Sequence, residues 1–141
     1  MERQYNVGID SNSVTIQIKT GTASTCYTSV SQFLGGGQKI LKAESSVTDN
    51  GVIAKKNIGV AADLKNTKLI VQTVADFSAL ADEIVQAIKQ DPHSLKTYLV
   101  IEYLFTGGFS GNQIYDYDYD DFVISSSGKM VIVTKHIDLI V

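Results

Sequence analysis

Hydrophobic and polar residues alternate along much of the chain, and this spacing is typical of β-strands that bury one face. In residues 14–19 three β-branched apolar residues alternate with three polar ones. Residues 95–106 predict a long strand in which every second side chain is apolar and belongs in the core. These core-facing residues are Leu99, Ile101, Tyr103 and Phe105. The run at 68–74 is nearly continuous and β-branched, so it predicts a central strand covered on both faces.

Polar and glycine-rich clusters separate the strands in the first third of the chain. Asp10-Ser11-Asn12-Ser13 predicts a turn between two strands in residues 5–20, because these side chains hydrogen-bond locally to the backbone. The three consecutive glycines at 35–37 predict a flexible loop, since glycine loses the most conformational entropy inside a regular element. Residues 22–34 are rich in serine and threonine, and both a strand and an irregular loop fit them.

The dipeptide Asn50-Gly51 is the strongest turn signal in the chain. It lies between two extended runs, residues 39–48 and 52–62. Asparagine and glycine both adopt positive φ at low cost, which suits the two central positions of a tight hairpin turn. The sequence therefore predicts a β-hairpin here.

The spacing of apolar residues changes to a helical period in residues 77–90. Six apolar side chains recur three or four positions apart and form one stripe: Phe77, Leu80, Ala81, Ile84, Val85 and Ile88. Asp91-Pro92 is a stop signal at the C-terminal end. We predict one inserted α-helix at about residues 77–90, with its apolar stripe packed on a sheet.

Residues 115–122 alternate tyrosine with aspartate, and we call this segment the acidic ribbon. On a strand the tyrosines would line one face and the aspartates the other. The turn at 125–129 then predicts an antiparallel hairpin between the ribbon and the last strand, residues 130–141. In that last strand, the residues expected on the buried face are Val131, Val133, Ile137, Leu139 and Val141.

Taken together, these elements predict a mainly β protein of about eight strands with short turns. The chain of 141 residues is the length of a single globular domain, 1–141, that can bury a core without disulfides. No βαβ rhythm indicates a parallel sheet. We predict an antiparallel β-sandwich or flattened barrel with the one inserted helix.

Composition narrows the range of partners and compartments. The net charge of −3 removes the electrostatic basis for unspecific nucleic-acid binding. The chain has no apolar run long enough for a membrane span and no apolar leader, so we expect neither. The single Cys26 weakly favours a reducing, cytoplasmic location, and an exported domain freed of its leader would have the same composition.

Three aspartates of the ribbon form a candidate metal site. Asp116, Asp118 and Asp120 follow the spacing of the first ligands of a calcium loop, although the glycine and the distant glutamate of that loop are missing. On a straight strand the three carboxylates would lie too far apart to hold one ion, and in a bent loop they would converge. Calcium is the only cofactor that the sequence suggests. The alternative is a solvated acidic edge that discourages aggregation.

Opposite charges in two regions suggest an interface. Six of the 12 basic residues fall within 39–68, and the ribbon carries four of the 15 acids and no base. Tyrosine is enriched at protein interfaces. The candidate interface residues are Tyr115, Tyr117, Tyr119, Lys55 and Lys56.

Catalytic signatures are weak, so the enzyme question stays open and leans towards no. His93 and His136 lack the spacing of zinc ligands, and we expect both at the surface. Ser110 lies in Gly108-Phe109-Ser110, but position 112 is asparagine where a nucleophile elbow has glycine.

Three functional hypotheses follow from these observations. The first is a non-enzymatic binding or assembly module that binds a protein partner, or itself, through the Lys-rich hairpin region and the ribbon. The second is a calcium-stabilised β domain. The third is a small-molecule binder or enzyme with a site assembled from distant residues, under the loop at 107–112 for example.

Overall fold

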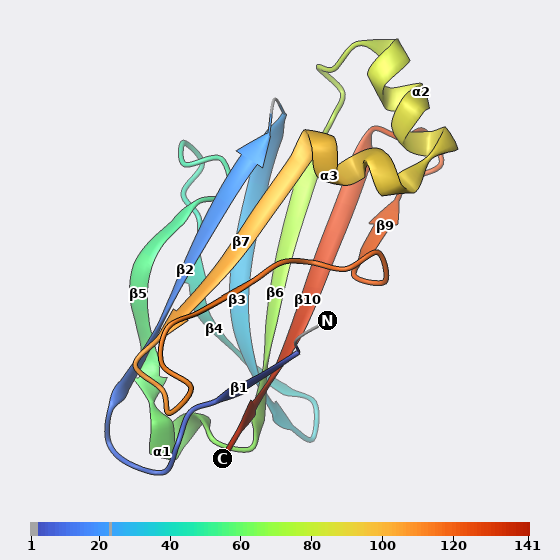
Figure 1. Ribbon diagram of the computed structural model, residues 1–141. Helices are drawn as coiled ribbons and strands as arrows, with labels where there is room; N and C mark the ends of the chain where they lie inside the picture. The colour runs from blue at the N-terminus through green and yellow to red at the C-terminus, as the bar shows by residue number, and fades with distance from the viewer. Residues whose placement is uncertain (1–2, 23) are drawn as a thin grey trace.

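The computed structural model describes residues 3–22 and 24–141, so Met1, Glu2 and Ala23 lie outside it. These residues form a β-sandwich of two sheets (Figure 1). One sheet has the strand order β1-β10-β6-β3-β4, with β9 also paired to β10, and the other has the order β5-β2-β7-β8. The ten strands are β1 (Gln4–Asn6), β2 (Ser13–Thr22), β3 (Thr25–Gly35), β4 (Gln38–Glu44), β5 (Ile53–Val60), β6 (Thr67–Asp76), β7 (Leu99–Thr106), β8 (Gln113–Tyr115), β9 (Phe122–Ile124) and β10 (Met130–Ile140).

The alternation of apolar and polar residues placed the core faces correctly. In β7 the side chains of Leu99, Ile101, Tyr103 and Phe105 are all completely buried, and the residues between them are not. In β6 the prediction of a central strand is confirmed, because β6 pairs with β10 and β3. Only one face of β6 is fully buried, however, since Gln72 on the other face is exposed.

The Asn50-Gly51 turn does not close a hairpin, so that prediction was wrong. β4 pairs with β3, and β5 pairs with β2 in the other sheet. The turn itself has the expected conformation, with φ of 51° at Asn50 and 85° at Gly51. It carries the chain from one sheet to the other because the Asn50 side chain binds the start of β3, where its Oδ1 accepts from the Cys26 N–H at 2.7 Å.

The predicted helix is shorter at its N-terminal end. α2 spans Asp82–Gln90, and residues 77–81 form a turn. The Phe77 side chain is completely buried and its N–H donates to the Lys129 carbonyl at 2.6 Å, so this residue extends β6 into the core. At its C-terminal end α2 stops at Gln90, as Asp91-Pro92 predicted, and two further short helices follow: the 3-10 helix η1 (Pro92–Ser94) and α3 (Leu95–Tyr98). A further short helix, α1 (Ala61–Leu64), links β5 to β6.

The serine- and threonine-rich segment at 22–34 proves to be mostly strand, since β3 begins at Thr25 and pairs with β6 and β4. The short β1 pairs with β10 in parallel, an exception to the predicted antiparallel pattern. Among the described residues, no helix has the length and apolar character needed to cross a membrane.

Candidate functional site

The acidic ribbon is not one strand, which corrects the sequence-based prediction. β8 ends at Tyr115, β9 begins at Phe122, and the residues between them cross from one sheet to the other. The crossing contains a tight turn in which the Asp121 N–H donates to the Asp118 carbonyl at 3.0 Å. The Asp121 carboxylate accepts from the Asp118 N–H at 2.7 Å, so aspartate side chains stabilise the turn instead of lining a strand. The predicted hairpin survives only as the pairing of β9 with β10.

The three ribbon tyrosines have different environments. Tyr115 and Tyr117 are buried, and the Tyr117 hydroxyl donates to the Leu99 carbonyl at 2.6 Å. Burial raises the pKa of the Tyr117 hydroxyl well above its usual value, and the nearby Asp116 charge adds to the effect. Tyr119 is 47% exposed. Of the three predicted interface tyrosines, only Tyr119 therefore offers its ring to a partner.

Three of the four ribbon aspartates, Asp116, Asp118 and Asp121, form ion pairs with cationic side chains. Asp116 Oδ2 accepts from Lys96 Nζ at 2.9 Å, and Asp118 Oδ2 lies 3.3 Å from Arg3 Nη2. Asp120 is exposed. In the part of the chain that the structure describes, no three histidine, cysteine, aspartate or glutamate side chains are grouped so as to hold a metal ion.

A partly buried ion cluster, composed of Arg3, Asp118, Asp121 and Lys135, holds the ribbon against β10. The Lys135 side chain is completely buried, and its Nζ lies 3.6 Å from Asp121 Oδ2 and 4.0 Å from Asp118 Oδ2. Arg3 Nη1 lies 3.4 Å from Asp121 Oδ1. Burial raises the pKa of the Tyr103 hydroxyl well above its usual value, and the charge of Asp121 adds to the effect.

Sequence reasoning missed Lys135, although a signal was present. Val131, Val133, Ile137 and Leu139 are buried as predicted, whereas Val141 is exposed because it lies beyond the end of β10. Position 135 shares the parity of the buried residues. A lysine at a core-facing position of a strand indicates a buried charge with acidic partners near it. The two acids that meet Lys135 come from a segment whose path the alternation pattern predicted wrongly.

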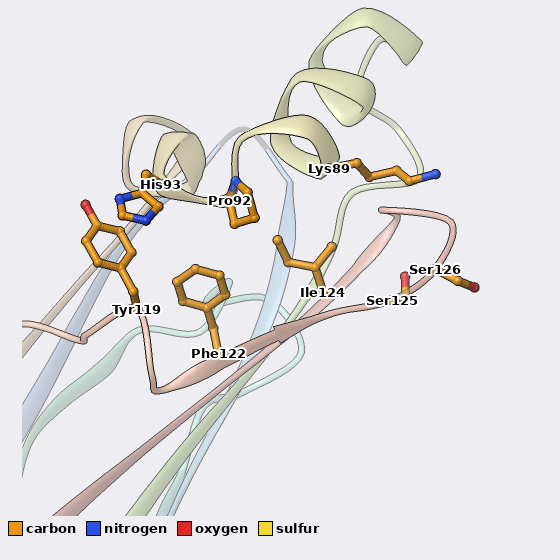
Figure 2. Close-up of a pocket in the computed structure, with 8 residues that line it drawn as sticks. All are labelled: Lys89, Pro92, His93, Tyr119, Phe122, Ile124, Ser125 and Ser126. Carbon is orange, nitrogen blue, oxygen red and sulfur yellow. The ribbon is translucent and has the colours of Figure 1, made fainter.

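Next to the ribbon lies a cleft of about 580 Å³, which we call the aromatic cleft. Figure 2 shows its residues, which come from the helical region, the ribbon and the β9–β10 turn. They are Lys89, Pro92, His93, Tyr119, Phe122, Ile124, Ser125 and Ser126. The end of α2 reaches the turn because Gly128, at φ 78°, has no side chain, and a Cβ there would lie 2.6 Å from Lys89 Cγ.

Rings form one wall of the aromatic cleft. His93 and Tyr119 stack with their ring centroids 4.0 Å apart, and Phe122 meets Tyr119 edge-on at 6.2 Å. Behind them Lys96 Nζ lies 5.4 Å from the Tyr119 ring centroid. His93 and His136 are both exposed, as predicted. The cleft therefore combines an apolar, aromatic surface with Lys89, an imidazole and two serines.

The register of β9 directs part of its backbone away from β10. The Thr134 N–H donates to the Asp121 carbonyl and the Ser125 N–H donates to the Met130 carbonyl. In an antiparallel pair, bonded residues alternate with non-bonded ones. The N–H and C=O groups of Phe122 and Ile124 consequently point outward, on an edge of the sheet where no strand of the described residues pairs.

Four lysines lie on the other side of the sandwich. Lys55 and Lys56 are exposed on β5, and Lys39 and Lys42 lie on β4; we call these four lysines the basic edge. β4 and β5 are the terminal strands of the two sheets, and Figure 1 shows them on the side away from β9 and β10. In residues 3–22 and 24–141 no ion pair engages these lysines.

A second cleft, of about 410 Å³, lies beside the 107–112 loop, under which the sequence allows a small-molecule site. Phe109, 81% exposed, forms part of its wall. In comparisons with known proteins, no family model, no curated protein and no solved structure matches this chain.

Proposed function

We propose that this protein is a non-enzymatic binding module that holds an extended, acidic segment of a partner protein in the aromatic cleft. The observation that carries the proposal is a cleft of about 580 Å³ beside a strand, β9, whose outer edge is unpaired among the described residues. A groove between a helix and a free strand edge suits an extended peptide, because main-chain hydrogen bonds supply affinity and side-chain pockets supply specificity.

The apolar surface of the cleft supports a peptide with a large apolar side chain. Phe122 and Ile124 are only partly buried, and together with Pro92 they offer an apolar surface beside the Tyr119 ring. Tyrosine and other aromatic residues are enriched where binding energy concentrates. A ligand side chain that packs on these groups would bury apolar surface that is exposed in the unbound protein, and this burial would favour binding.

Charge supports an acidic ligand. Lys89 is the only formally charged residue among the eight that line the cleft, and its side chain is exposed. Two nearby cations are already paired, Lys96 with Asp116 at 2.9 Å and Arg3 with Asp118 at 3.3 Å. A carboxylate placed near Lys89 would therefore meet an unshared positive charge.

Selection of a random-peptide library against the protein tests this function. We expect enriched peptides that combine an acidic residue with a large apolar residue. Lys89→Glu is expected to weaken their binding about tenfold or more, the effect of losing one charge-assisted contact and gaining a repulsion.

Lys55→Glu is the matched control, because it makes the same charge change on the basic edge and is expected to leave the affinity unchanged. Calorimetric titration of both variants with the best selected peptide measures the difference. If no peptide is enriched, or if both variants lose affinity equally, the cleft is not the binding site.

Self-association is a second candidate function, favoured by the position of the basic edge on the side of the sandwich away from the ribbon. Opposite charges on opposite sides favour head-to-tail contacts between copies. The ribbon offers less free charge than its sequence suggests, since Asp116, Asp118 and Asp121 each pair with a cation.

Light scattering after size-exclusion chromatography tests this second candidate. Assembly through these edges would give a mass above the monomer at low salt that falls towards the monomer at high salt, because screening weakens exposed charge pairs. Lys55→Glu/Lys56→Glu would abolish it. A monomer at every concentration and salt would overturn this form of the function.

A further inference from the structure

The Lys135 amine is held in the core beside two carboxyl groups. Its side chain is 0% exposed, the Asp121 side chain is 3% exposed and the Asp118 side chain is 15% exposed. Among the described residues, Lys135 Nζ and the Tyr103 hydroxyl are the two buried side-chain polar atoms without a hydrogen-bond partner.

The distances are those of near contact and not of a formed hydrogen bond. Charge-assisted N–H···O bonds are about 2.7–2.9 Å long. Lys135 Nζ lies 3.6 Å from Asp121 Oδ2, and the carboxyl carbon of Asp121 is one bond beyond that oxygen. Reacting atoms held about 3–3.5 Å apart in a fixed geometry react as if at very high concentration, and a small approach of Lys135 Nζ to this carbon reaches that range.

We propose that Lys135 and Asp121 condense into an intramolecular isopeptide bond. A bond forms between Lys135 Nζ and Asp121 Cγ, and one Cγ–O bond of the carboxyl group breaks. The ammonium carries three protons, of which one stays on the amide nitrogen and two leave with the carboxylate oxygen as water. The reaction is balanced by the two side chains alone and needs no oxidant or cofactor.

Two neighbours are placed to assist the condensation. Asp118 Oδ2 lies 4.0 Å from Lys135 Nζ, so a small approach of the two side chains brings it within hydrogen-bond reach, where it takes a proton from the ammonium and returns it to the departing oxygen. Arg3 Nη1 lies 3.4 Å from Asp121 Oδ1, where it stabilises the negative charge that develops when the amine adds to the carboxyl carbon.

The surroundings favour the product. Condensation replaces a buried ammonium and a buried carboxylate with a neutral amide, which removes the cost of keeping two charges out of water. The bond ties the ribbon turn to β10, next to Phe122 in the wall of the aromatic cleft. This modification is independent of the ligand proposed for the cleft.

The mass of the intact wild-type protein, measured after denaturation, tests the proposal. We expect a mass lower than that of the sequence by one water molecule. Trypsin is expected to leave the chain uncut after Lys135, and fragmentation of the resulting peptide pair should place the link between Lys135 and Asp121.

Lys135→Arg keeps a cation at the site but cannot form the amide, so it is expected to retain the full mass. Asp118→Asn removes the proton carrier, and we expect the fraction of linked chains to fall at least tenfold. A wild-type protein with the full sequence mass, cut normally after Lys135, would overturn the proposal whatever the variants do. So would a water loss that persists in Lys135→Arg.

Discussion

Asp121→Ala is expected to lower the free energy of unfolding by about 3–5 kcal/mol, the cost of leaving a buried charge without its partner. Lys135 is completely buried, and Asp121 provides the nearer of its two carboxylates. The variant would also lose the Asp121 contact to the Asp118 N–H, which stabilises the ribbon turn. The sign of the effect is the same whether the native pair is ionic or an amide, because the variant leaves the amine in the core in both cases. Urea denaturation followed by circular dichroism measures it.

Two further variants separate buried charge from general damage. The double variant Asp121→Ala/Lys135→Met is expected to recover much of the loss, since it removes the stranded amine and fills its place with an apolar side chain of similar length. Asp116→Ala breaks the ion pair to Lys96, in which the Asp116 side chain is 54% exposed. That change is expected to cost about 1 kcal/mol or less. If Asp121→Ala lowers the free energy of unfolding no more than Asp116→Ala does, the ion cluster around Lys135 contributes little to stability.

Local side-chain patterns predicted this fold where burial alone decides the conformation. Leu99, Ile101, Tyr103 and Phe105 face the core because a strand alternates its faces, and no other part of the chain alters that geometry. The pattern did not predict which strands pair, because several segments that are distant in the sequence compete to pair with the same strand. Asn50-Gly51 adopts its expected conformation, yet β4 pairs with β3 and β5 with β2 because those neighbours complete two sheets.

The candidate site was harder to predict, for a related physical reason. The aromatic cleft joins residues of α2 and η1 to residues of the ribbon and the β9–β10 turn, and only the folded chain brings these segments together. Lys135 could have been found from its parity in the last strand. Its partners could not, because the ribbon bends away from the strand conformation that its alternation suggests.

Tyr117→Ala is expected to lower the free energy of unfolding by about 3–5 kcal/mol, as other large aromatic side chains do when they are removed from a core. The Tyr117 side chain is completely buried and meets Phe122 edge-on with ring centroids 6.0 Å apart. Tyr117→Phe keeps the ring but leaves the Leu99 carbonyl without its donor, and we expect a smaller loss of about 1 kcal/mol. The same urea denaturation experiment ranks the three proteins.

Tyr119→Ala is the matched comparison, two residues along the same ribbon. Its ring is 47% exposed and stacks on His93, so its removal is expected to cost less than about 1.5 kcal/mol of stability. The same change should weaken binding of a selected peptide about tenfold, because it removes an aromatic wall of the cleft. Tyr117→Ala would then mainly lower the free energy of unfolding, and Tyr119→Ala would mainly lower the affinity for the peptide. Equal stability losses at the two positions would contradict the burial difference, and unchanged peptide affinity in Tyr119→Ala would remove the ribbon from the binding site.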